Sequence, residues 1–189
     1  KAEEMLGDFI KARCISKRML QEMGAYPDLL PSSTTYGYLM FPVENGVIGR
    51  DFIGRGYDER YHNVGSKTPI NVDEDRNESI LVEGLFDYIA LRELGITSAV
   101  CVHGCTISDK LAYSFRNKFV FILFDRDHAG YNGARDAVKK LEKYDAFPII
   151  LELPKRFGND PSEALARDRD GFADWLRGEL GKTKGTDES

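Results

Sequence analysis

"KFVFILFDRDHAG", residues 118–130, joins a run of six large apolar residues to two aspartates that are one residue apart. The run from Phe119 to Phe124 is typical of a strand that is buried on both faces, as in a parallel sheet. A strand of this kind is expected to finish in a turn. This one finishes at Asp125 and Asp127, so the segment predicts a buried parallel sheet with a polar function at its edge.

The region around this segment alternates apolar runs with helical segments. Strands that alternate with helices predict a parallel sheet with right-handed crossover connections. Gly95 suits the end of one helix, and a proline suits the first turn of another. The expected strands cover residues 79–82, 98–102, 119–124 and 147–153, and the expected helices cover 85–94, 108–115, 131–144 and a segment from Pro161. We therefore expect an α/β domain over residues 79–177.

The first part of the chain has a different texture. Two helical segments, the second with Ser16 as its N-cap, precede short, turn-rich strands. The ENG segment at residues 44–46 lies between two apolar runs and predicts a hairpin. We expect a small mixed α+β subdomain over residues 1–78, and a disordered tail or linker over residues 178–189.

Composition excludes several classes of protein. The chain has 189 residues, 42% of them hydrophobic, and no stretch approaches the ~20 apolar residues of a membrane span. Its start lacks the apolar stretch of a signal peptide, and because it begins with Lys1 we expect a longer parent protein. Three cysteines are too few for a disulfide framework, which favours a reducing cytoplasm. The net charge of −5 argues only weakly against a nucleic-acid partner.

Acidic residues follow the strands in a pattern that predicts a metal site. Ligands of an open parallel sheet bind beyond the carboxyl ends of its strands. Clustered carboxylates cost several kcal/mol each when they leave water unpaired, so a hard dication such as Mg²⁺ or Mn²⁺ is expected among them. The acids at this edge are Glu83 after the first strand, Asp87 one turn later, Asp125 and Asp127 after the third strand, and Asp160 after the fourth.

The alternative for Asp125 and Asp127 is turn and capping chemistry, which is the commoner role of an isolated acid-any-acid pair. Glu83 at a second strand end changes that balance in favour of metal. Gly84 and Gly130 fit a metal site as well, because glycine lets the backbone approach a ligand closely.

Three segments resemble the signature segments of the TOPRIM domain, the metal-binding fold of DnaG-type primases, topoisomerases and some nucleases. They are SILVEGLFDYIAL at 79–91, FILFDRDHAGYNGA at 121–134 and NDPSEAL at 159–165. Upstream, LMFPVENGVIGRDFIGRG and RYHNVGSKTPI resemble the segment that precedes TOPRIM in bacterial and phage primases. The resemblance implies a Rossmann-like, mostly parallel sheet flanked by helices, preceded by a small mixed α+β basic subdomain.

The resemblance also implies an activity. It is that of a primase catalytic core, a nucleotidyltransferase that makes short RNA primers on a single-stranded DNA template from ribonucleoside triphosphates. Glu83 matches the general acid/base of the family, and Asp125 and Asp127 match its metal-binding pair. Asp87 and Asp160 match its further acids, with two or more Mg²⁺ or Mn²⁺ ions. A replicative helicase, in the same or a separate chain, is a further implied partner, in the cytoplasm of a bacterium or a phage-infected host.

Polar residues of the first subdomain are the candidate contacts to nucleic acid or nucleotide. Such contacts to phosphate position a template without reading its bases. The chain departs from the family at Ser162, where many primases have a second aspartate, and at Tyr38, where a basic residue is frequent. The candidate contacts are Arg50, Arg55, Arg60, Asn63 and Lys67.

Other functions use parts of the same pattern. A TOPRIM nuclease would cleave phosphodiester bonds at the same acids, and a non-catalytic module would bind single-stranded nucleic acid around a structural metal. A phosphatase would not require Glu83. It would be expected to have a small hydroxyl residue after Asp127, and this chain has His128 and Ala129 there. The CVHGC segment at residues 101–105 invites a zinc site, but too few further ligands accompany it, and a strand-to-helix turn is the simpler interpretation.

Overall fold

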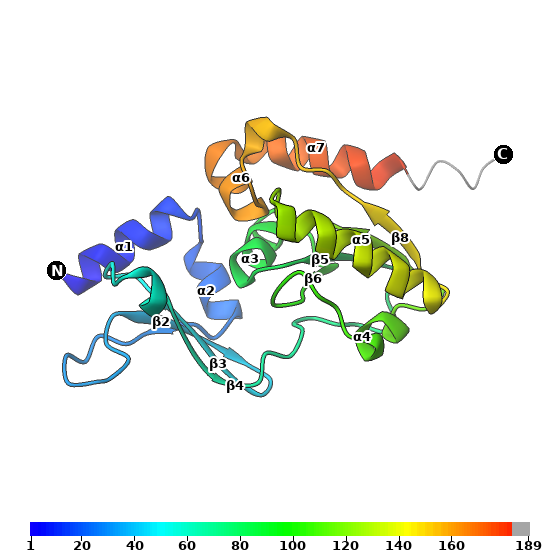
Figure 1. The fold of residues 1–189 in the computed structure, drawn as a ribbon. Coiled ribbons are helices and arrows are strands. Elements are labelled where there is room, and N and C mark those ends of the chain that lie inside the picture. The colour runs from blue at the N-terminus through cyan, green and yellow to red at the C-terminus, as the bar shows by residue number, and fades with distance from the viewer. Residues whose placement is uncertain (183–189) are drawn as a thin grey trace. The chain divides into compact units, whose positions relative to one another are not determined.

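The computed structural model describes residues 1–182 and divides into two compact units, Lys1–Ile70 and a second that begins at Asn71 (Figure 1). The expected boundary was eight residues later. The difference arises because the polar segment at residues 71–78 is hydrogen-bonded to the second unit. Asn71 Nδ2 donates to the carbonyls of Thr97 and Ala99 at 2.9 and 2.7 Å, and Lys118 Nζ donates to the Glu74 carbonyl.

The first unit is an antiparallel sheet accompanied by two helices. Ser16 caps the second helix as expected, since its Oγ accepts a hydrogen bond from Met19 N at 3.1 Å. The expected hairpin is also present, with Val43 paired to Gly46 across its turn. The sheet order is β1-β2-β3-β4. The elements are α1 (Ala2–Ala12), α2 (Lys17–Glu22), β1 (Tyr26–Pro27), β2 (Tyr38–Val43), β3 (Gly46–Asp51), η1 (Tyr57–Glu59) and β4 (Tyr61–Gly65).

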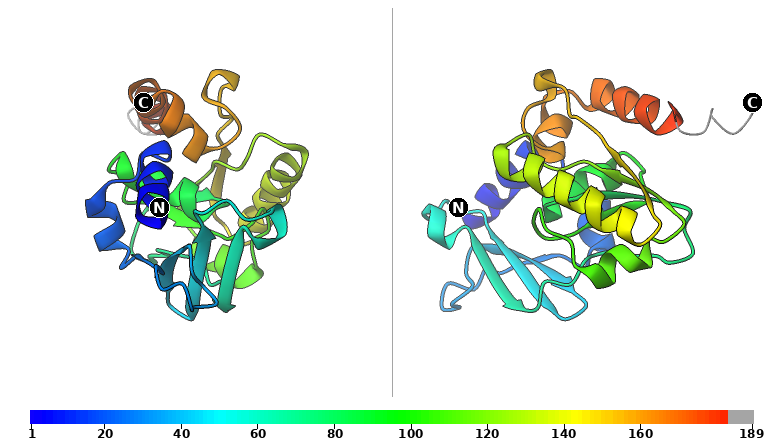
Figure 2. Two further views of the ribbon diagram at one scale, coloured as in Figure 1. Left: turned by 90° about the vertical axis from the view of Figure 1, so that its left-hand side faces the viewer. Right: turned by 45° about the vertical axis from the view of Figure 1, so that its right-hand side comes forward.

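The second unit is a four-stranded parallel sheet in the order β6-β5-β7-β8 with helices around it, which confirms the expected fold class. The right-hand view of Figure 2 shows α5 lying along the sheet. The elements are β5 (Glu78–Val82), α3 (Leu85–Glu93), β6 (Ala99–Cys101), α4 (Asp109–Ser114), β7 (Phe119–Ile122), α5 (His128–Lys143), β8 (Phe147–Ile150), η2 (Lys155–Phe157), α6 (Pro161–Arg167) and α7 (Arg169–Lys182).

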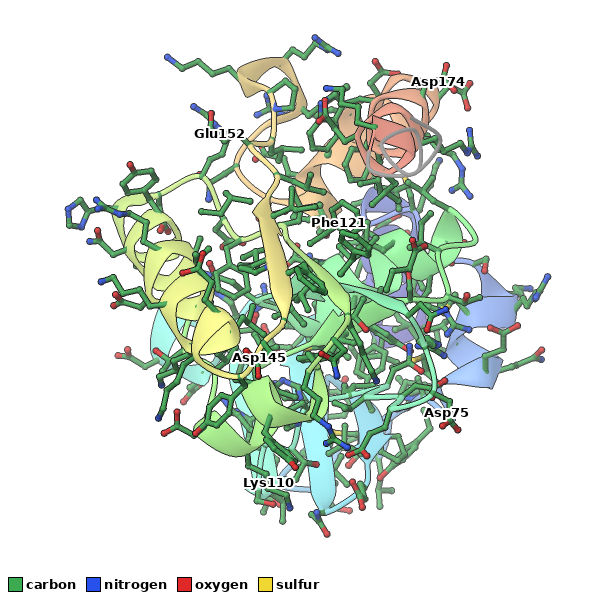
Figure 3. All side chains as sticks on the ribbon, turned by 90° about the vertical axis from the view of Figure 1, so that its right-hand side faces the viewer. Asp75, Lys110, Phe121, Asp145, Glu152 and Asp174 are labelled. Carbon is green, nitrogen blue, oxygen red and sulfur yellow. The ribbon has the colours of Figure 1, made fainter. Side chains whose placement is uncertain are left out.

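Strand β7 is buried on both faces, as its apolar run predicts. Val120 and Ile122 pack into one cluster with side chains of α4 and α5, while Phe121 points to the other face; all three are 0% exposed. Figure 3 shows Phe121 among packed side chains, with Lys110 and Asp174 at the surface. This core fixes the end of β7, and therefore the position of the acids that follow it.

The helices differ from expectation at two points. Helix α5 begins at His128, three residues early, because Asp127 caps it by accepting from Gly130 N at 2.8 Å. The C-terminal helical segment is two helices, since Asp168 leaves helical geometry (φ −155°, ψ 82°) and accepts from Gly171 N at 3.0 Å.

The second of these helices, α7, reaches Lys182, so residues 178–182 of the expected tail are helical, and 183–189 lie outside the described residues. Across residues 1–182, no helix has both the length and the apolar character needed to span a bilayer.

Candidate metal centre

Glu83 and Asp125 meet at the carboxyl edge of the parallel sheet. Strands β5 and β7 are neighbours, with Leu81 paired to Ile122, so the residues that follow them emerge side by side. Asp125 N donates a hydrogen bond to Glu83 Oε1 at 3.0 Å. Burial raises the pKa of the Glu83 carboxyl, and the nearby Asp127 raises it further, against the opposing effect of the hydrogen bond from Asp125.

Asp125 carries the least satisfied carboxylate oxygen of this edge. Its Oδ1 is buried and has no hydrogen-bond partner among the described residues. Burial raises the pKa of Asp125 to about 7, with further contributions from Glu83, Asp160 and Asp127. A buried carboxylate oxygen without a donor, surrounded by other acids, is an arrangement that a bound cation would stabilise.

Asp87 and Asp160 complete the group, and each is engaged by backbone. Asp87 is 7% exposed, and its two oxygens accept from Gly84 N at 3.0 Å and from Ser162 N at 3.2 Å. Burial raises the pKa of Asp87 well above its usual value, and Asp160 and Asp125 add to that effect. Asp160 caps α6, accepting from Glu163 N at 2.7 Å. Asp87 thus connects the start of α3 to the start of α6.

The loop that carries Asp160 is attached to the loop that carries Asp125 and Asp127. Arg126 N donates to the Asn159 carbonyl at 2.7 Å, and Asn159 N donates to Glu163 Oε2 at 2.6 Å. Glu163 also forms an ion pair with Arg167, and the bond from Asn159 N is the main reason that its pKa lies below the usual value. Glu163 is therefore engaged in capping and does not replace the acid that is absent at Ser162.

Gly130 allows the first turn of α5 to pack directly on this edge. A Cβ atom at this position would lie 2.2 Å from the Asp125 carbonyl oxygen and 2.7 Å from Glu83 Oε1. Both distances are shorter than real Cβ contacts. Glycine is required here by close approach, as its place in the sequence suggested.

The donor set fits a hard divalent cation. It is composed of carboxylate oxygens. Burial and neighbouring acids raise the pKa of three of its members, Glu83, Asp87 and Asp125, and one buried Asp125 oxygen lacks a donor among the described residues. Within residues 1–182, no group of three or more His, Cys, Asp or Glu side chains is arranged so that it could hold a metal ion by itself. Mg²⁺ does not need one, because it keeps several waters and binds one or two carboxylates together with substrate phosphates.

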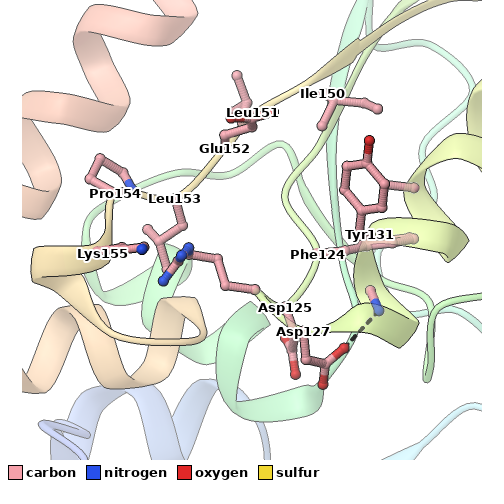
Figure 4. A pocket seen from close by; sticks show the side chains of 13 residues that line it. Phe124, Asp125, Asp127, Tyr131, Ile150, Leu151, Glu152, Leu153, Pro154 and Lys155 are labelled. Carbon is pink, nitrogen blue, oxygen red and sulfur yellow. Dashed lines mark hydrogen bonds between the residues drawn. The ribbon is translucent and has the colours of Figure 1, made fainter.

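A pocket of about 470 Å³ opens beside the acids (Figure 4). Figure 4 shows Asp125 and Asp127 together at one side, Tyr131 and Ile150 at another, and Leu153, Pro154 and Lys155 opposite. No sequence pattern indicated this pocket, because its walls come from two loops and a helix that only the fold brings together. The lining residues are Phe124, Asp125, Arg126, Asp127, Gly130, Tyr131, Ala134, Ile150, Leu151, Glu152, Leu153, Pro154 and Lys155.

The CVHGC segment forms a turn next to Glu83. Gly104 N donates to the Glu83 carbonyl at 2.9 Å, and Cys101 Sγ lies 3.7 Å from the same oxygen. His103 has a positive φ of 59°, and its Nδ1 lies 3.5 Å from Cys101 Sγ. These contacts orient the loop after β5.

In the first unit, two candidate residues, Arg50 and Asn63, lie on strands β3 and β4. Arg50 pairs with Tyr61, and Ile48 pairs with Asn63, so Arg50, Tyr61 and Asn63 share one face of the sheet. The Arg50 guanidinium lies 4.5 Å from the centre of the Tyr61 ring, and burial lowers its pKa to about 10. Asn63 and Tyr61 are exposed.

Arg55 is engaged by the fold of the first unit itself. Its Nη1 lies 2.9 Å from Asp51 Oδ1, its Nη2 donates to the Tyr36 carbonyl, and its guanidinium lies 4.7 Å from the centre of the Tyr38 ring. Arg55 thus supplies a basic group beside Tyr38, the position where the family frequently has one. Lys67 is exposed, and Arg60 is partly exposed.

We expect Arg55→Met to destabilise the first unit and Lys67→Met to leave its stability unchanged. The Asp51 side chain is only 5% exposed, so loss of the Arg55 guanidinium leaves Asp51 Oδ1 without its charged donor, at a cost of about 1–3 kcal/mol. The Lys67 substitution should stay within about 0.5 kcal/mol of the wild type. Urea unfolding of both variants checks this, and equal stabilities would contradict a structural role for Arg55.

Comparison with known proteins agrees with the fold. Residues 80–165 match the model of a family described as Toprim-like. The DNA primase of Thermotoga maritima is 32% identical over 94 residues, which cover 49% of this chain and 16% of that protein. The chain covers between 14% and 37% of the lengths of the curated relatives it matches.

Solved structures resemble almost the whole chain in fold. The Aquifex aeolicus primase, comprising zinc-binding and RNA polymerase domains, superposes with a TM-score of 0.74 at 20% identity, covering 93% of this chain and 55% of that one. A DnaG primase catalytic domain bound to single-stranded DNA gives 0.72 at 18% identity, covering 96% and 72%. At such identities the likeness shows that the fold is shared.

Proposed function

Because residues 80–165 match a family described as Toprim-like, we propose that this chain is the catalytic core of a DNA primase, which synthesises short RNA primers on single-stranded DNA from ribonucleoside triphosphates. The observation that carries the proposal is the contact between Glu83 and Asp125 beside a buried, unpartnered Asp125 oxygen. The similarity to DNA primases in sequence and fold supports it. One similar catalytic domain carries single-stranded DNA, which supports that template as a partner.

The acids at this edge of the sheet would have different roles. Asp125 and Asp127 would hold a divalent cation, and Glu83 would complete its shell or accept the proton of the attacking 3′-hydroxyl. A bound Mg²⁺ or Mn²⁺ supplies charge neutralisation for the triphosphate and lowers the pKa of that hydroxyl. Asp87, with both oxygens on backbone N–H groups, would position the loops around Glu83 and Asp160. A second ion would use Asp160.

The first unit would contact the template and the nucleotide. Arg50, Arg60, Asn63 and Lys67 are the residues that we assign to these phosphate contacts, with the exposed Tyr61 ring available for base stacking. Arg55 would act indirectly, by holding the loop after β3. The three free cysteines suit a reducing compartment, in keeping with a cytoplasmic primase that works beside a replicative helicase.

The test is template-directed incorporation of ribonucleotides on single-stranded DNA with Mg²⁺ or Mn²⁺, with any separate template-binding module supplied. We expect Glu83→Gln to reduce synthesis by about 10²-fold or more without unfolding the protein. Glu142→Gln, an exposed acid on α5, is the matched control and should retain activity. DNA cleavage without synthesis would favour a nuclease. Binding of nucleic acid that is insensitive to chelator, with neither activity, would favour a non-catalytic module.

A further inference from the structure

The pocket beside the acids is lined by two basic side chains. Arg126 and Lys155 both line it, and within residues 1–182 neither side chain makes a hydrogen bond or an ion pair. Three carboxylates line the same pocket, those of Asp125, Asp127 and Glu152, and none of them forms an ion pair with Arg126 or Lys155 in the described part of the chain. The pocket therefore presents separated positive and negative groups to whatever enters it.

This separation of charge restricts the chemistry of the ligand. A simple anion would be repelled by the carboxylates, and a simple cation would be repelled by Arg126 and Lys155. A polyphosphate that carries a divalent ion satisfies both, because its ion faces the carboxylates while its remaining oxygens accept from the guanidinium and the ammonium.

The remaining walls suit a flat apolar group. Phe124, Leu151 and Leu153 form a buried floor, each no more than 5% exposed, and the Tyr131 ring is 56% exposed at the rim. An exposed aromatic ring beside cations is a surface on which a base can stack. The volume of about 470 Å³ lies in the range of small-ligand sites.

We propose that this pocket is a nucleotide subsite, in which Arg126 and Lys155 bind the polyphosphate of a metal-bound nucleoside triphosphate and Tyr131 stacks on its base. The inference rests on the proposed function and deepens it, since it names residues that would hold the incoming nucleotide. Arg126 is well placed for this role, because its backbone N–H bond to Asn159 fixes the loop while its side chain remains exposed.

The test is equilibrium binding of Mg²⁺-ATP and of Mg²⁺-tripolyphosphate to the full chain, measured by isothermal titration calorimetry. We expect Arg126→Met and Lys155→Met each to lower the affinity for both ligands about tenfold, because each variant loses a charge-assisted hydrogen bond to the polyphosphate. Tyr131→Ala should lower the affinity for Mg²⁺-ATP about tenfold and leave the affinity for Mg²⁺-tripolyphosphate unchanged. Lys110→Met, an exposed lysine on α4, is the control that alters the same net charge and should change neither affinity.

The outcomes separate this inference from the proposed function. Unchanged affinities in the Arg126→Met/Lys155→Met double variant, or no binding of either ligand to the wild type, would overturn the subsite, whatever the primer assay shows. If the double variant loses binding while the wild type makes no primer, the subsite stands and the proposed function fails. Equal weakening of tripolyphosphate and ATP by Tyr131→Ala would refute the placement of the base.

Discussion

Replacing Asp125 with asparagine should make the metal-free protein more stable at pH 8. Burial and three neighbouring acids raise the pKa of Asp125 to about 7, from an ordinary value of 3.8. The folded protein therefore binds this proton more tightly than the unfolded chain does. The resulting loss of stability is absent below about pH 4, grows as the pH rises from 4 to 7, and is complete above 7. An amide at this position carries no charge at any of these pH values.

We expect Asp125→Asn to gain about 1–3 kcal/mol in unfolding free energy at pH 8, after allowance for screening by solvent, and little at pH 4. Thermal unfolding in chelator at both pH values measures this. Added Mg²⁺ should raise the melting temperature of the wild type and leave that of the variant unchanged. Asp136→Asn, an exposed acid on α5, is the control that should not alter the response to Mg²⁺. A variant less stable than the wild type at pH 8 would refute the account of this carboxylate.

The same substitution should remove activity. Asp125 has the buried oxygen that we assign to the cation, and its loss is expected to reduce primer synthesis by about 10²–10³-fold or more. A gain in stability together with a loss of activity distinguishes a functional acid from a structural one, because replacing a structural acid would lower both the stability and the activity of the protein. Primer synthesis per folded molecule is the measurement.

Gly130→Ala should destabilise the protein and impair the same site, although alanine normally favours a helix. The added Cβ would lie 2.2 Å from the Asp125 carbonyl oxygen, and backbone cannot move aside as a flexible side chain can. Overpacking of this kind costs about 1–3 kcal/mol, and a shift of α5 would displace Glu83 from Asp125.

Gly178→Ala on α7 is the matched control, because nothing lies within 4 Å of its Cβ position. We expect it to gain about 0.4–1 kcal/mol and to retain full activity. Urea unfolding and primer synthesis compare the two variants. The close approach at Gly130 would be disproved by two alanine variants of equal stability and equal activity.

The parallel sheet was predictable because its signal is local. Phe119–Phe124 is apolar without interruption, and a short run of this kind between turn signals is typical of a buried parallel strand; residues 120–124 are in fact buried. The contact of Glu83 with Asp125 followed from the same reasoning, since neighbouring parallel strands end at one edge. Sequence periodicity and topology therefore carry most of the site.

Features that depend on tertiary contacts could not be predicted in the same way. The partner of Asp87, Ser162, lies on a helix that is distant in sequence. Only the fold shows that both Asp87 oxygens accept hydrogen bonds from backbone N–H groups. Arg55 looks like a phosphate contact in a glycine-rich loop, whereas its ion pair with Asp51 reveals a structural role. The pocket at Arg126 and Lys155 lies between two loops, and nothing in the sequence of either loop predicts that they are neighbours.

The most direct test of a cation shared at this edge is a crystal of the protein grown with Mn²⁺ and measured for anomalous scattering. We expect a peak about 2.1 Å from Asp125 Oδ1, with Asp127 or Glu83 as a second ligand. Mn²⁺ found only at other residues, or an Asp125 oxygen that receives a hydrogen bond instead of a metal, would contradict it.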